Sequence, residues 1–357
     1  MSRIMITSAL GLVAVPLLRL RRRFPVFAYV ANRAAIYAVM LLAIGFVVFG
    51  LMALMPGDLA DQIAARFNVL GLSPEDPQIT PEQLEYLRAH MGLDAPWQVQ
   101  YLRWVAGALR GDFGTDHEGR TPVAFLIRQR LFNTALLNAV SFAITSALAF
   151  ALGILFSARP GSRADFAATS FALFLYAIPP LAVMLGLQVF ARTTWLFPVA
   201  GLPVRSMAPN LAAFALMYAH HIFLLVVANF AFGFGPTLRM VKMLMSDEIG
   251  KPYVLALRSR GMAERSVLFR HAFRNALNPF ISWGGVQIIG LLSGSVMLEM
   301  VFAFPGIGRL MMQAAQRQDG NVIMAVIMVV AATVLVVMLV ADIALAFLDP
   351  RIRYGKG

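Results

Sequence analysis

The feature that most constrains this chain is a series of long segments that contain no Asp, Glu, Lys or Arg. The six segments are residues 34–57, 131–158, 166–191, 206–238, 275–298 and 320–341. Each reaches the length of about 20 residues that an α-helix needs to cross the hydrocarbon core of a bilayer. Hydrophobic residues make up 59% of the chain, well above the usage of soluble domains. Since backbone polar groups in lipid must bond within the segment, we predict an all-α, polytopic integral membrane protein with about six transmembrane helices.

The charges between these segments predict the orientation of the chain. Lys and Arg dominate residues 1–33, 239–274 and 349–357, whereas acidic residues outnumber basic ones in residues 58–130. Because basic loops stay in the cytoplasm, both termini and the 239–274 loop are predicted to be cytoplasmic, and 58–130 to form a periplasmic helical loop. The net charge of +12 is therefore attributed to orientation and contact with membrane lipid rather than to binding of nucleic acid.

The first 33 residues form a predicted cytoplasmic segment with an apolar stretch at 4–18. This stretch is too short to cross the bilayer, contains Pro16 and is followed by an arginine cluster, so we predict a helix lying in the membrane interface. An additional span remains an alternative. The chain has no cysteine, which excludes disulfides and cysteine-based zinc sites.

The 239–274 loop is a basic segment with helical patterning between two predicted spans. Residues 253–260 are predicted to form a short helix that Gly261 ends by adopting a left-handed conformation. A second helix is predicted from Ala263 onward. Its apolar face is predicted to consist of Phe269, Ala272, Phe273 and Ala276, with Arg270 and Arg274 on the opposite face.

The residues of this loop resemble, in order, the cytoplasmic loop of bacterial ABC importer permeases, and most closely that of the B-type subunit of dipeptide, oligopeptide and nickel importers. The matching residues are Tyr253, Val254, Ala256, Arg258, Gly261, Glu264, Arg270, His271, Ala272, Arg274, Asn275, Ala276 and Pro279. The chain departs from the pattern at Leu255 and Leu257, and it has Ala263 where the family favours a serine N-cap.

The resemblance implies that this loop is a coupling helix docking on an ATP-hydrolysing subunit. The expected ATPase-coupling residues are Tyr253, Val254, Ala256, Arg258, Arg260, Gly261, Glu264, Arg270 and Arg274. The expected partners are a second homologous permease, two ABC ATPase subunits that carry ATP and Mg²⁺, and a periplasmic or lipoprotein solute-binding protein. The chain itself is expected to bind no cofactor and to act as a transport subunit in the bacterial inner membrane.

Other motifs extend the resemblance from about residue 29 to residue 353. They are Pro56, Gly57 and Asp58 after the first span, Gly92 to Asp94, Gly111 to Gly114, Phe304 to Arg309, and Leu348 to Arg351. Residues 131–348 are accordingly expected to form the permease core, which transports peptides or a related small solute.

The periplasmic loop is predicted to contain two helices. Thr80 and Gln83 form a capping box at the first helix, and the second follows Asp94. The second helix carries one face of Trp97, Tyr101, Trp104, Val105 and Ala108. In the resembling family such a loop helps to receive the solute-binding protein; the alternative is an aromatic belt at the bilayer surface.

Two features within the spans are candidates for function. Tyr176, Pro179 and Pro180 are predicted to kink the third span and to line the translocation path, with a simple packing kink as the alternative. Gly290 and Gly294 are spaced for close helix packing, either against the partner permease or within this chain.

The sequence contains no recognisable catalytic motif. A stand-alone secondary transporter or channel is the main rival hypothesis, and an intramembrane enzyme is a second. Ion coupling would need titratable groups in the spans, for which Asp342, His220 and His221 are the candidates. We predict that Asp342 reaches the cytoplasmic interface and that the histidines are structural.

Overall fold

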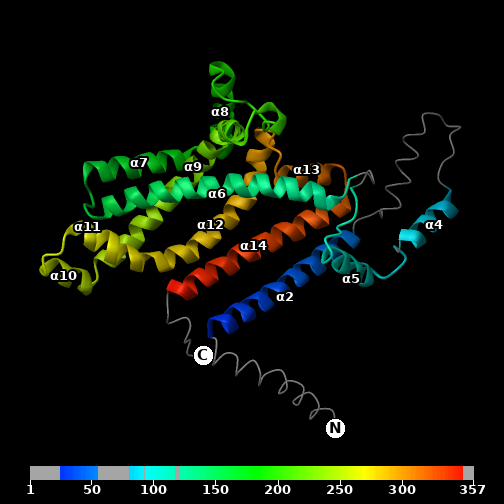
Figure 1. Cartoon of the computed structure of the whole chain (residues 1–357), viewed down its shortest axis with the longest axis horizontal. Helices are drawn as coiled ribbons and strands as arrows, with labels where there is room; N and C mark the ends of the chain where they lie inside the picture. Colours follow the sequence, from blue (N-terminus) through cyan, green and yellow to red (C-terminus); the bar gives the residue numbers. More distant parts are fainter. Residues whose placement is uncertain (1–24, 55–79, 92, 117–120, 349–357) are drawn as a thin grey trace, which may run out of the picture. The chain divides into compact units, whose positions relative to one another are not determined.

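The structure is a computed structural model that describes residues 25–54, 80–91, 93–116 and 121–348 (Figure 1). The helices are α2 (Pro25–Ala53), α4 (Pro81–Met91), α5 (Trp97–Ala108), α6 (Val123–Ser157), α7 (Arg163–Ala177), α8 (Pro180–Thr194), η1 (Arg205–Met207), α9 (Leu211–Ile249), α10 (Pro252–Ser259), α11 (Glu264–Ser266), η2 (Val267–Ala272), α12 (Phe273–Val301), α13 (Ile307–Gln316) and α14 (Gly320–Leu348). Over these residues the predicted all-α fold is confirmed. The segments predicted at 4–18 and 349–357, the motif at 56–58 and Gly92 lie outside the described residues.

Four of the described helices are long and apolar enough to cross a membrane, namely α2, α6, α9 and α14. Helices α7 and α8 together meet the same criterion but are bent by 93° at the break between them. The remaining predicted span, 275–298, falls within α12, where many side chains lie outside the described part of the chain. That sixth span therefore stays a prediction.

Two spanning helices extend beyond the charge-free segments that predicted them. Helix α6 begins at Val123, ahead of Arg128, and α9 continues to Ile249, beyond Arg239 and Lys242. Arg and Lys end an apolar segment, but both have high helix propensity. The helices α6 and α9 therefore continue beyond the part that crosses the hydrocarbon.

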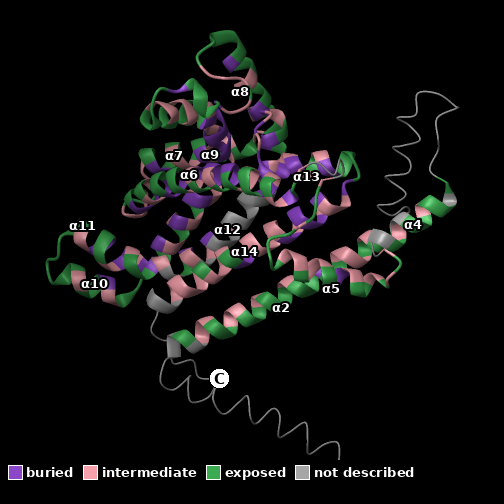
Figure 2. Ribbon diagram, turned by 45° about the vertical axis from the view of Figure 1, so that its right-hand side comes forward, coloured by how far each residue is buried: buried purple, intermediate pink, exposed green. Residues whose placement is uncertain are grey.

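The chain divides into two compact units, and each is described separately. The first comprises residues 1–35, 131–309 and 334–357, and the second comprises 36–130 and 310–333. One core of the first unit joins side chains of α6, α8, α9 and α12, including the fully buried Leu137 and Leu298. Figure 2 shows buried residues concentrated on α9, whereas α2 is mostly exposed along its length. An apolar helix with so little buried surface is suited to contact lipid or a partner chain.

In the second unit the aromatic face of α5 packs within the protein. Tyr101 is only 4% exposed, and its hydroxyl donates a 2.7 Å hydrogen bond to the carbonyl oxygen of Leu42 in α2. Tyr101 also belongs to a buried cluster with Met324 and Met328 of α14. Gly50 leaves room for the Trp97 ring, since a Cβ at residue 50 would lie 3.2 Å from it. The aromatic face of α5 therefore packs on α2 and α14 within this unit, and its role at the bilayer surface or toward a solute-binding protein stays a prediction.

The predicted capping box at the start of α4 is confirmed. The backbone N–H of Gln83 donates to the Thr80 hydroxyl at 3.3 Å, and the N–H of Thr80 donates to the Gln83 side-chain oxygen at 3.0 Å. The second helix of the loop follows Asp94 as predicted; it begins at Trp97, with Pro96 at its N-cap.

Candidate functional site

The candidate site is the coupling corner, defined here as residues 248–276, which includes α10, α11 and η2. Helix α10 begins with Pro252 at its first position, where a missing N–H is harmless. It ends in a Schellman motif: Gly261 has a φ of +73°, its N–H donates to the Arg258 carbonyl at 2.9 Å, and the Met262 N–H donates to the Leu257 carbonyl at 3.3 Å. The left-handed conformation predicted for Gly261 is confirmed.

An ion pair closes the corner on its outer side. The Nε and Nη2 atoms of Arg258 donate to the two carboxylate oxygens of Glu264 at 3.1 and 2.6 Å. The hydrogen bond from Arg258 holds the pKa of Glu264 below its ordinary value and, in return, raises the pKa of Arg258. Because the two side chains are 37% and 49% exposed, this pair adds little stability and instead orients α11 relative to α10.

A polar network around the buried carboxylate of Glu248 holds the inner side of the corner. Glu248, near the end of α9, is 5% exposed, forms an ion pair with Lys251 and accepts a 2.9 Å hydrogen bond from the Tyr253 hydroxyl. The Asn275 side chain of α12 donates to the same hydroxyl at 3.1 Å. Burial raises the pKa of Tyr253, and its hydrogen bond to the carboxylate acts in the same direction. The network therefore connects α9, α10 and α12.

Glu248 was not predicted to have a role, and Asn275 was not among the predicted coupling residues. The sequence did contain a sign of this network. Glu248 lies three residues before Lys251 and five before Tyr253, so the three side chains can meet where α9 ends. The folding back of α12 onto this point, which brings in Asn275, depends on the tertiary structure.

The coupling residues of α10 divide into anchors and exposed positions. Val254 is completely buried and Tyr253 is partly buried, so both face the body of the protein. Ala256, Arg258 and Arg260 are exposed, and Leu255 is 69% exposed. The exposed residues are therefore the ones available to a partner.

The predicted apolar face of the second helix is partly wrong. Val267, Leu268, Ala272 and Ala276 are buried, whereas Phe269 is 41% exposed. The cause is the π-helical turn η2, whose wider turn shifts the buried face by one residue. Leu268, Ala272 and Ala276 belong to one buried cluster with Ile154 of α6 and with Val241 and Met245 of α9. Arg270 and Arg274 are exposed as predicted.

The proline break in the third span is sharper than the predicted kink. Helix α7 ends at Ala177, and α8 begins at Pro180. Ile178 and Pro179 are both extended, with ψ values of 129° and 133°, because each of them precedes a proline. Tyr176, Pro179 and Pro180 are all exposed, so they are available to a path or to a partner chain.

The titratable candidates within the spans have local partners. Asp342 lies 3.5 Å from the Nε atom of Arg33. Ring nitrogens of His220 and His221 lie 2.7 and 2.8 Å from the backbone oxygens of Leu196 and Met217. These contacts support the prediction that the histidines are structural. Gly290 and Gly294 lie in α12, and their packing is outside the described part of the chain.

Near the end of α12, the carboxylate of Glu299 is fully buried, which was not predicted. It accepts a 2.7 Å hydrogen bond from the Thr134 hydroxyl and a 2.8 Å hydrogen bond from the Arg309 backbone, with Ser295 and the Gly308 N–H as further donors. Because Glu299 directly follows the charge-free segment 275–298, the sequence placed it in the loop after the predicted span. The two glycines at 306 and 308 could have indicated a turn that leaves no room for side chains, since a Cβ at either position would lie within 3.0 Å of the Glu299 carboxylate.

In the described parts of the chain, no three His, Asp or Glu side chains are grouped to hold a metal ion. Arg258, Arg260, Arg270 and Arg274 instead make the corner basic and suited to docking on a partner.

Comparison with known proteins agrees with this architecture. The family model "Binding-protein-dependent transport system inner membrane component" matches residues 149–354, and the model of the corresponding N-terminal region matches 26–124. The oligopeptide transport system permease protein AppB of Bacillus subtilis is 34% identical over 92% of this chain and 99% of its own length. The dipeptide transport system permease protein DppB of Escherichia coli is 30% identical over 78% of this chain and 87% of its own.

The fold is also similar to a solved structure. A chain of the MetNI methionine ABC transporter in an inward-facing conformation aligns with a TM-score of 0.51 and 17% identity, over 63% of this chain and 97% of that one. Together with the family matches, this likeness confirms the permease fold. The chain belongs to the family of inner membrane components of binding-protein-dependent transport systems.

Proposed function

We propose that this chain is one of two permease subunits in an ATP-driven, binding-protein-dependent importer for peptides or a related small solute. The names of its relatives, an oligopeptide permease and a dipeptide permease, support the substrate class. In this proposal a homologous permease encloses the path with this chain, and two ABC ATPase subunits bind ATP and Mg²⁺. A solute-binding protein delivers the solute from outside, and both termini lie in the cytoplasm.

The observation that carries the proposal is that α10 is anchored on one side and exposed on the other. Glu248, Tyr253 and Asn275 hold its start, and the Gly261 turn with the Arg258–Glu264 pair holds its end. An amphipathic helix seated in a groove of a partner transmits rigid-body motion when it is joined firmly to the rest of its protein. The exposed Ala256, Arg258, Arg260, Arg270 and Arg274 form the proposed docking surface.

In the proposed cycle, closure of the ATPase subunits moves α10 and, through the hydrogen bonds of Glu248, Tyr253 and Asn275, also α9 and α12. The path then alternates between inward-facing and outward-facing states. Tyr176, Pro179 and Pro180 line this path, and Gly290 and Gly294 pack against the partner permease. The loop containing α4 and α5 contributes to the surface that receives the solute-binding protein.

The first test separates coupling from folding with two matched glycine variants. Gly261 and Gly161 both have positive φ, and a Cβ at either residue would meet nothing within 4 Å. A valine at either position therefore introduces similar backbone strain of about 1–3 kcal/mol. In the reconstituted importer, Gly261→Val is expected to lower ATP-driven uptake at least tenfold while ATP hydrolysis continues, and Gly161→Val is expected to leave uptake nearly unchanged. Normal uptake with Gly261→Val, or equal loss in both variants, contradicts the proposal.

The second test addresses the stand-alone transporter or channel. Because the chain has no cysteine, Leu255→Cys places a single thiol on the exposed side of α10. It is expected to crosslink to an ATPase subunit, whereas Arg159→Cys, in the neighbouring loop, is not. Proteoliposomes that contain this chain without ATPase subunits are expected to show no solute flux, and flux there would favour the rival hypothesis.

A further inference from the structure

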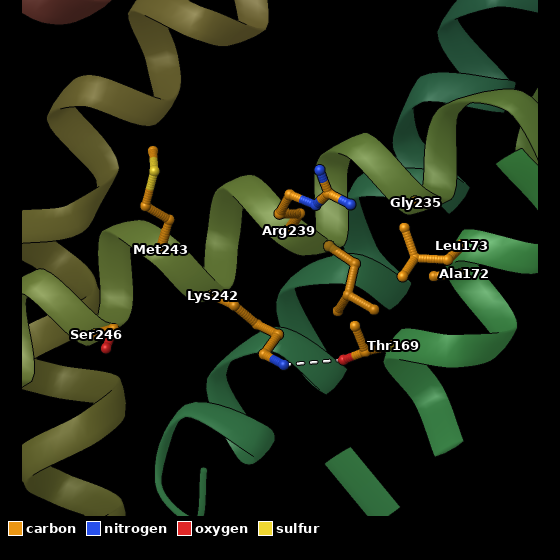
Figure 3. Close-up of a pocket in the computed structure, with 9 residues that line it drawn as sticks. Thr169, Ala172, Leu173, Gly235, Arg239, Lys242, Met243 and Ser246 are labelled. Carbon is orange, nitrogen blue, oxygen red and sulfur yellow. Dashed lines mark hydrogen bonds between the residues drawn. The ribbon is translucent and has the colours of Figure 1, made fainter. Parts of the chain in front are cut away.

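A cavity of about 300 Å³ lies between α7 and α9 (Figure 3). Its polar lining comes from Thr169, Arg239, Lys242 and Ser246, and most of the remaining lining is apolar. This volume is at the lower end of the range of small-molecule sites, about 300–1,000 Å³. The cavity therefore has room for a compact polar group with an apolar extension.

Two contacts define the cavity between the helices. At one end, a Cβ on Gly235 would lie 2.7 Å from the carbonyl oxygen of Ala172, so the two backbones approach closely there. At the other end, Lys242 forms an ion pair with Asp165 and donates a 2.9 Å hydrogen bond to Thr169. These contacts preform the walls of the cavity without a ligand.

The charge of Arg239 is unbalanced. Asp165 compensates Lys242, but Arg239 forms no ion pair or hydrogen bond with any residue in the described ranges. Arg239, Lys242 and Ser246 are spaced three and four residues apart, which places them on one face of α9. The cavity thus has one free guanidinium, a group whose planar set of donors matches a phosphate.

The position of the cavity is that of a membrane interface. Asp165 is three residues after Ser162, the N-cap of α7, and Ser246 is three residues before the end of α9. On the apolar side, Leu173 is 43% exposed and Met243 is 50% exposed, so the cavity is bordered by surface suited to lipid chains. Basic pockets between membrane helices near the cytoplasmic surface are suited to anionic lipid headgroups.

We propose that this cavity binds the phosphate group of an anionic membrane lipid. The Arg239 guanidinium holds the phosphate oxygens, the Ser246 hydroxyl donates a further hydrogen bond, and Leu173 and Met243 contact the glycerol and the start of the acyl chains. The apolar border favours a lipid over free phosphate, because an inorganic ion would leave this surface uncovered.

The test measures lipid retention by the purified full-length chain. Protein from nanodiscs of equal parts phosphatidylglycerol and phosphatidylcholine is delipidated in steps, and the retained lipid is counted by native mass spectrometry. Arg239→Gln is expected to lower retention of phosphatidylglycerol about fivefold, the equivalent of about 1 kcal/mol. Arg159→Gln removes the same charge from a neighbouring loop outside the cavity and is expected to keep retention within about twofold of the wild type. Equal loss in both variants would show general surface attraction and overturn the proposal.

Two further arms complete the test. Millimolar inorganic phosphate is expected to leave the bound lipid in place, and its displacement by phosphate would assign the cavity to the free ion instead. Leu173→Trp fills the apolar side without changing charge and is expected to reduce retention while the protein remains monodisperse. Unchanged retention with Leu173→Trp overturns the proposal even if Arg239→Gln fails to fold.

Discussion

The hydroxyl of Thr134 donates a 2.7 Å hydrogen bond to the buried carboxylate of Glu299, which lies 165 residues away in the sequence. The same hydroxyl accepts a 2.9 Å hydrogen bond from the N–H of Ile307, and Arg309 donates its N–H to the second carboxylate oxygen. The carboxylate thus lies at the N-terminus of α13, where the helix dipole favours negative charge. This contact joins α6 and α12 and fixes the turn that leads into α13.

Removal of the Thr134 hydroxyl should destabilise the fold. Thr134→Val keeps the shape of the side chain but leaves the Ile307 N–H without its acceptor and removes a donor from Glu299. We expect the free energy of unfolding in mixed micelles to fall by about 2–3 kcal/mol. Thr193→Val is the control, because the Thr193 hydroxyl is exposed and bonds within its own helix. It should change the free energy by less than about 0.5 kcal/mol, and an equal effect of the two variants would contradict a special role for Thr134.

Gly306 should tolerate no side chain. A Cβ at residue 306 would lie 2.2 Å from the Glu299 carboxyl carbon, so Gly306→Ala should lower the free energy of unfolding by at least about 1–3 kcal/mol. Gly186, within α8, has nothing within 4 Å of the corresponding position. Gly186→Ala should therefore be neutral or should stabilise by up to about 1 kcal/mol through its helix propensity. The free energy of unfolding is measured for both variants in the same way. If Gly306→Ala leaves it unchanged, the Glu299 side chain can move aside and the prediction is wrong.

The Tyr253 hydroxyl should couple energetically to Glu248. We expect Tyr253→Phe and Glu248→Gln each to destabilise the coupling corner, because each removes a hydrogen bond between the Tyr253 hydroxyl and the buried Glu248 carboxylate. A double-mutant cycle read by hydrogen exchange of the α10 amides should give an interaction energy of about 1–2 kcal/mol. Additive effects would show that the two side chains act independently.

The outer side of the corner should loosen in acid. Since Arg258 holds the pKa of Glu264 below its ordinary value, the pair contributes stability above that ordinary value and loses it as the pH falls through the lowered pKa. Protection of the Met262 and Val267 amides should therefore be constant above about pH 6 and should decrease as the pH falls through the lowered pKa of Glu264, by less than about 1 kcal/mol because both side chains are exposed.

Glu264→Gln should remove most of this pH dependence from the two amides. Glu85→Gln, an exposed change on α4, serves as the control and should leave the dependence intact. Persistence of the full acid effect in Glu264→Gln would exclude Glu264 as its source.

Features that depend on neighbouring residues were predictable from the sequence. The apolar segments identified α2, α6, α9 and α14, the pair Thr80 and Gln83 identified the start of α4, and Gly261 identified the end of α10. Each of these signals acts within one helix or one turn, so that hydropathy or a single hydrogen bond decides the local structure. The order of motifs also identified the family before any contact was known.

Features that depend on distant partners were decided by the tertiary structure. The sequence by itself determined that the chain is a bundle of membrane helices with a basic, glycine-ended corner. Only the folded chain showed that Glu299 is buried beside Thr134, that Asn275 completes the Glu248 network and that the π turn exposes Phe269. Burial of a polar group is stable only when partners satisfy its hydrogen bonds, and here those partners lie on other helices, so no local pattern could identify them.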